Sequence, residues 1–101
     1  MRSYFCKDLD TEVSFVCKQR PDYLEVLMYD SEVGVFSTIS IPFSTGRKFT
    51  AYIDAHEYPW LEKFLVDNKV ATMTHRSFIY NGHLCQEFNF MEEILYERKN
   101  H

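Results

Sequence analysis

Alternating apolar and polar positions mark the first half of the chain. Three segments show this pattern and are bounded by turn residues: 12–19, 23–29 and 35–41. In the second segment Leu24, Val26 and Met28 share one face. Pro42 then ends the third segment, because proline cannot donate a ladder hydrogen bond. The pattern predicts three antiparallel strands joined by short connections.

Helical spacing follows in the middle of the chain. One apolar stripe recurs at i, i+3, i+6 and i+7: Tyr58, Leu61, Phe64 and Leu65. Pro59 suits the first turn, where its missing N–H is harmless, and Asn68 is a suitable C-terminal stop. Residues 49–54 are expected to lead from a strand into this helix.

A hairpin is predicted around Asn81-Gly82, since both residue types accept the positive φ of a two-residue turn. This turn fixes the cross-strand pairs as Tyr80–His83, Ile79–Leu84, Phe78–Cys85, Ser77–Gln86 and Arg76–Glu87. The last pair brings opposite charges together, and no pair opposes like charges.

The tail, Met91 to Arg98, is expected to form a short closing helix with Asn89 as its N-cap. Together these elements predict a single α+β domain over residues 1–101. It would have an antiparallel sheet of about five strands, one central amphipathic helix and a short C-terminal helix.

Composition narrows the setting. A chain of 101 residues fits one domain, and it lacks the apolar core of a signal peptide or a membrane helix. Three widely spaced cysteines do not form a disulfide framework, so we expect small buried side chains and a cytoplasmic protein. The net charge of −4 and the scattered basic pairs disfavour nucleic-acid binding.

The segment from residue 49 to residue 90 carries a further pattern. It runs Ala51, Tyr52, Ile53, Asp54, then Pro59, Phe64, Leu65, Asn68, then Ala71, Thr74, Arg76, and ends at Phe88, Asn89. This pattern resembles a family of small bacterial domains of unknown function found on chromosomes, plasmids and phage-like elements. The chain departs from the family at His75, where a Gly-rich step is usual. The resemblance implies an α+β fold and an accessory role on a mobile element, with no catalytic residues.

Residues with catalytic chemistry are present but not in catalytic patterns. The predicted hairpin puts His75 and His83 on opposite faces, and no zinc-ligand spacing occurs, so we expect no metal. Cys85 opposite Phe78 suits packing rather than a reactive thiolate. The loop 44–48 has one glycine and lacks the spacing of a phosphate-binding loop, so a solvated loop is expected.

The segment Asp54-Ala55-His56-Glu57 gathers titratable groups before the helix. We expect Asp54 or Glu57 to satisfy free N–H groups at the helix start, with an acid/base corner as the alternative. No catalytic residue and no cofactor are therefore predicted.

Aromatic side chains are the strongest functional signal. Seventeen Phe, Tyr and Trp residues exceed the interior places of so small a domain, so some are expected on the surface as anchors for a protein partner. The candidate partner-binding residues are Tyr58, Trp60, Asp54, Glu57, Glu62 and Asp67, with Glu92, Glu93 and Glu97 as further acidic groups. The favoured function is a non-enzymatic protein-binding accessory protein of a phage or mobile element, which binds a host or defence-system protein. One concrete form is an inhibitor of a bacterial defence system, of the anti-CRISPR kind.

Two alternatives stay open. A small-ligand module that binds a nucleotide would use Thr74, Arg76, Ser77 and Tyr80 as polar groups in an aromatic pocket. A structural homodimer would bury the aromatic residues between two copies and pair edge strands across a two-fold axis.

Overall fold

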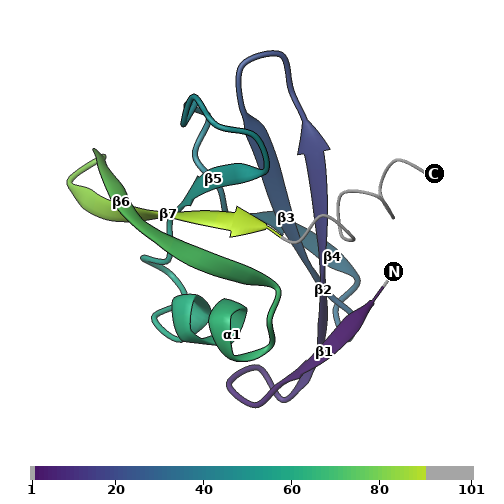
Figure 1. Cartoon of the computed structure of the whole chain (residues 1–101). Coiled ribbons are helices and arrows are strands. Elements are labelled where there is room, and N and C mark those ends of the chain that lie inside the picture. The colour runs from purple at the N-terminus through teal and green to yellow at the C-terminus, as the bar shows by residue number, and fades with distance from the viewer. Residues whose placement is uncertain (1, 91–101) are drawn as a thin grey trace.

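The protein is described by a computed structural model for residues 2–90, which contain two antiparallel sheets and one short helix (Figure 1). The first sheet has the order β1-β2-β3-β4, formed by β1 Ser3–Cys6, β2 Thr11–Gln19, β3 Leu24–Asp30 and β4 Val35–Thr38. The second has the order β5-β7-β6, formed by β5 Thr50–Ile53, β6 Ala71–Tyr80 and β7 His83–Phe90. The helix α1 is Leu61–Asp67. Among residues 2–90, no helix has the length and apolar character needed to cross a membrane.

The α+β class expected from the sequence is wrong, because the described chain is mostly antiparallel strand with one helix of seven residues. Two sheets of four and three strands replace the single sheet of about five. The strand β1 was not predicted, and β6 extends back to Ala71, further than the hairpin turn indicated. The second helix expected at residues 91–98 lies outside the described residues.

The predicted meander is confirmed for β2, β3 and β4, which pair antiparallel in sequence order. Leu24, Val26 and Met28 are all buried, as their alternation indicated. The third strand is shorter than expected and ends at Thr38. Beyond it, Ser40 makes a single antiparallel bridge to Ile53, so the chain passes from the first sheet to the second there.

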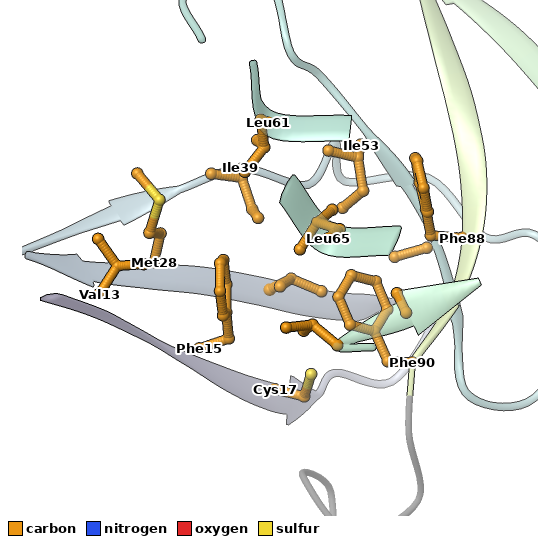
Figure 2. Packing of buried hydrophobic residues seen from close by; sticks show 14 of the residues in the cluster. Val13, Phe15, Cys17, Met28, Ile39, Ile53, Leu61, Leu65, Phe88 and Phe90 are labelled. Carbon is orange, nitrogen blue, oxygen red and sulfur yellow. The ribbon is translucent and has the colours of Figure 1, made fainter. Parts of the chain in front are cut away.

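One apolar core lies between the sheets and beneath α1 (Figure 2). β2 contributes Val13, Phe15 and Cys17, while α1 contributes Leu61 and Leu65. The second sheet contributes Ala51, Ile53, Ala71, Phe88 and Phe90. The strands and the helix each present one apolar side to this core, which is why alternation and helical spacing were both visible in the sequence.

The helix α1 starts later than predicted. Tyr58, Pro59 and Trp60 form turns before it, and Trp60 occupies the N-cap position without a side-chain cap. The predicted stop at Asn68 is confirmed, since its Nδ2 donates to the Phe64 carbonyl at 3.0 Å. The chain reverses at Lys69, which adopts φ 58°.

The hairpin register predicted from Asn81-Gly82 is confirmed for the four pairs from Ser77–Gln86 to Tyr80–His83. Both turn residues have positive φ, 52° and 78°. Between Met73 and Ser77 the register of β6 shifts, and His75 at the centre of this bulge has φ 71°. Arg76 therefore leaves the regular ladder, although it still reaches Glu87.

Candidate functional site

Glu87, in the middle strand of the second sheet, is a carboxylate with no exposed side-chain surface. Arg76 Nε donates to its Oε1 at 2.8 Å, and Thr74 Oγ1 donates to the same oxygen. On the other side Arg47 Nε lies 3.5 Å from Oε2, which accepts no hydrogen bond within residues 2–90. The two arginine side chains are about half exposed, so one buried carboxylate holds two cationic side chains at the surface.

The ionisation of Glu87 follows from these contacts. Burial raises the pKa of this carboxyl, whereas hydrogen bonds from Thr74 and Arg76 and the positive charge of Arg76 lower it. The net pKa lies below the ordinary value of 4.5. Glu87 is therefore a permanent anion near neutral pH, and its role is to hold Arg47 and Arg76 in place.

An aromatic cluster covers the same face of the second sheet, next to the carboxylate. Its members are Phe43, Tyr52, Phe78 and Tyr80, from a loop, β5 and β6. The Phe43 ring lies 5.3 Å from that of Phe78 and 5.5 Å from that of Tyr80, and Tyr52 stacks on Phe78 at 5.4 Å. Phe43 and Phe78 remain exposed, so the aromatic cluster is a surface feature and not part of the core.

The opposite face of the hairpin is apolar as well. Ile79 and Leu84 pair across the ladder and are 69% and 57% exposed. Residues 77–86 contain no Asp, Glu, Lys or Arg. The outer half of the β6–β7 hairpin is thus uncharged with apolar side chains on both faces, and it forms one edge of the molecule (Figure 1).

The two aromatic anchors predicted from the sequence, Tyr58 and Trp60, lie before α1 and not on the hairpin. Tyr58 and Trp60 are half-buried and pack against the core cluster. The Trp60 ring lies 5.5 Å from Tyr58 and 5.7 Å from Phe64, so it closes the space beside α1. These two rings pack within the fold, whereas the exposed rings of residues 2–90 are phenylalanines outside the predicted partner-binding set.

The predicted acidic residues do not share one surface. Asp54 and Glu57 line one hollow of about 270 Å³ beside His56 and His83, and Glu62 lines a neighbouring hollow with the same two histidines. Asp67 forms an ion pair with Lys63 on the exposed side of α1. Asp54 accepts a hydrogen bond from the His56 N–H at 3.0 Å and does not cap the helix, which corrects the capping expectation.

Two histidines that the sequence analysis did not connect, His56 and His83, meet beside the hairpin turn. The His56 and His83 rings lie 3.8 Å apart in an edge-to-face arrangement, and His83 Nδ1 is buried without a hydrogen bond among residues 2–90. Within the same residues, no group of three or more His, Cys, Asp or Glu side chains is arranged to hold a metal ion.

Cys85 is buried, and its thiol is held in the protonated form. Burial, followed by the negative charges of Asp54 and Glu62, raises the pKa of this thiol. A nucleophilic cysteine needs the opposite surroundings. Cys6 and Cys17 are also buried, so the expectation of three packed cysteines is confirmed.

The four residues of the alternative nucleotide site divide into two pairs. Thr74 and Arg76 converge on Glu87, so part of their hydrogen-bonding capacity is already used. Tyr80 packs on Phe43, and Ser77 is exposed on the strand edge. Arg47 and Phe43 complete this face from a loop that is distant along the chain from β6 and β7, so no pattern within the hairpin pointed to them.

Comparisons with known proteins returned nothing: no family model, no curated protein and no solved structure matches this chain. The resemblance of residues 49–90 to small mobile-element domains accordingly stays a prediction.

Proposed function

We propose that this chain is a non-enzymatic protein-binding module whose contact surface is the outer half of the β6–β7 hairpin. The observation that carries this proposal is the apolar character of both hairpin faces, with Phe78 on one and Ile79 and Leu84 on the other. Exposed aromatic and aliphatic groups of this kind form the centres of protein interfaces. The partner-binding surface is therefore moved from the helix start, where the sequence suggested it, to the hairpin.

The polar groups around the aromatic cluster supply the rim of such an interface. The Arg47 and Arg76 side chains are about half exposed on this face of the sheet, and both are held by Glu87. Arginine held by a buried carboxylate loses little side-chain entropy when it meets a partner. The partner class expected from the sequence resemblance is a host protein or a component of a bacterial defence system.

A capture experiment with matched variants tests the proposal. Tagged wild-type protein, the double variant Ile79→Lys/Leu84→Lys and the control Phe5→Lys/Val66→Lys are each cross-linked in a bacterial lysate and purified. The control also replaces two exposed apolar residues, but outside the hairpin. We expect one species that is recovered with the wild type and the control and lost with the hairpin variant. Equal recovery by all three proteins, or no recovered species, would refute the proposal.

A further inference from the structure

The outer half of β6 is an unguarded sheet edge. β6 is the last strand of the order β5-β7-β6 and has no neighbour on its outer side within residues 2–90. Natural sheet edges are protected by charge, by bulges or by short length. The edge strands of the first sheet, β1 and β4, have four residues each, and the inner half of β6 carries the bulge at His75. Residues 77–80 have none of these protections.

The hairpin geometry defines which backbone groups face outward. In a two-residue turn the flanking residues Tyr80 and His83 exchange both of their hydrogen bonds, and hydrogen-bonded pairs then alternate along the ladder. Phe78 consequently bonds to Cys85 on β7. The N–H and C=O groups of Ser77 and Ile79 point away from β7, toward the open side.

We propose that the occupant of this edge is a second copy of the chain, paired antiparallel through β6 about a two-fold axis at Phe78. This inference goes beyond the proposed function: the self-pairing uses the backbone groups along the open edge of β6, and it leaves the side-chain faces of the hairpin for a foreign protein. Residues directly opposite in an antiparallel pair lie on the same face of the sheet, so only registers that match residues of like parity are allowed. Among these registers, the one with its axis at Phe78 places Ser77 of each copy opposite Ile79 of the other copy.

In this register, each outward-facing backbone N–H and C=O group of Ser77 and Ile79 has a hydrogen-bond partner in the second copy. The two Ser77–Ile79 pairs form four backbone hydrogen bonds, and Phe78 faces Phe78 in the close, non-hydrogen-bonded position. An axis at Ser77 would require pairing through the bulged His75, and an axis at Ile79 would require pairing through the turn residue Asn81. The structure thus selects one register from the allowed set.

Charge also favours a second copy at this edge. Each copy carries a net charge of −4, so two copies repel each other at most approaches. The segment 77–86 has no formally charged side chain and is flanked by Arg47 and Arg76. Here two acidic chains can meet without opposing carboxylates. The pairing would also join the aromatic clusters of both copies into one surface centred on the two Phe78 rings.

The first test is the mass of the protein in solution across a wide range of concentration, by sedimentation equilibrium. We expect a concentration-dependent shift from the 12.1 kDa chain to twice that mass. Ile79→Pro removes an outward N–H and leaves the β7 ladder intact, so it is expected to abolish the shift. The matched control is Ile79→Thr, which keeps the backbone N–H and is expected to retain the dimer.

The second test does not depend on the folding of the proline variant. Phe78→Cys should form an intermolecular disulfide under mild oxidation, because opposed side chains at a non-hydrogen-bonded position lie within disulfide range. Ile79→Cys is the control: it is more exposed, at 69% against 38%, but its opposite residue is Ser77. Both variants are made in a Cys85→Ser background, because Cys85 is the cross-strand partner of Phe78 and would otherwise capture the new thiol within the same chain. Cys6 and Cys17 are buried and contribute little background.

Equal cross-linking of the two cysteine variants, or a wild-type protein that stays at 12.1 kDa throughout, would overturn the self-pairing. The outcome separates this inference from the proposed function. A chain that remains monomeric but captures a foreign protein through its hairpin excludes the second copy and leaves the binding module intact.

Discussion

Arg76 Nε lies 2.8 Å from Oε1 of Glu87, and the two residues meet although a bulge removes Arg76 from the regular β6–β7 ladder. The regular register would also have placed Arg76 opposite Glu87, so the ion pair is kept despite the bulge. Thr74 donates to the same oxygen, and Arg47 lies beside the other oxygen, Oε2. Glu87 therefore links β6 and the loop that carries Arg47 to β7.

Replacing this carboxylate should destabilise the fold. Glu87→Gln leaves Arg47 and Arg76 facing a neutral, buried amide, and we expect it to lower the free energy of unfolding by about 1–3 kcal/mol. Urea denaturation measures the change. Glu25→Gln is the matched control, because Glu25 pairs with Arg20 at the surface, where the expected loss is below about 1 kcal/mol. Equal losses in the two variants would contradict a special role for Glu87.

The same carboxylate predicts how stability depends on pH. Since the folded pKa of Glu87 is depressed below 4.5, its contribution is fully present above that value and is lost as the pH falls through the folded pKa. The difference in unfolding free energy between wild type and Glu87→Gln should therefore be constant near neutral pH and shrink in acid. Denaturation curves at a series of pH values measure it, and a difference that grows in acid would reverse the sign of the argument.

Trp60 is expected to act in stability rather than in partner contact. Its ring packs on Tyr58 and Phe64 beside the core, so Trp60→Ala should cost on the order of 2 kcal/mol, less than for a fully buried ring. Val66→Ala, at an exposed position of the same helix, should change stability by about 0.5 kcal/mol or less. Loss of partner capture by a folded Trp60→Ala protein would return this residue to the binding surface.

The hairpin turn gives a prediction that isolates backbone strain. Gly82 has φ 78°, and a Cβ added there would meet nothing within 4 Å. Gly82→Ala should therefore destabilise the protein by about 1 kcal/mol through conformation alone. Asn81→Gly keeps the positive φ accessible and should preserve the turn. Thermal unfolding compares the two variants, and an unchanged melting temperature for Gly82→Ala would show that the turn relaxes without cost.

Local signals in the sequence predicted a good part of the strand framework. Asn81-Gly82 gave the hairpin register, and the alternation of Leu24, Val26 and Met28 gave the buried face of β3, because each depends on neighbours close along the chain. The α+β class was wrong because local patterns do not show how far a helix extends or which strand another strand pairs with. The apolar stripe of α1 is visible, but only seven residues become helical, while the strand β1 exists through its pairing with β2.

The candidate site was largely hidden from the sequence because its parts come from distant segments. Arg76 and Glu87 were paired by the hairpin, but Arg47 and Phe43 arrive from a loop about forty residues earlier, with no local motif to mark them. Trp60 was expected on the surface as an anchor for a protein partner. It is half-buried because the helix begins after it, at Leu61, and the stripe does not apply there.

The segment from Ile39 to Ile41 has a consequence for how the molecule comes apart. The Ile39 N–H bonds to the Val26 carbonyl of the first sheet, its own carbonyl accepts from the Asp54 N–H, and the Ile41 N–H bonds to the Tyr52 carbonyl of the second. The segment from Ile39 to Ile41 therefore belongs to the hydrogen-bond networks of both sheets and couples them. We therefore expect that neither sheet opens while the other stays closed. The amides of Ile39 and Ile41 should then exchange with deuterium only when the whole protein unfolds.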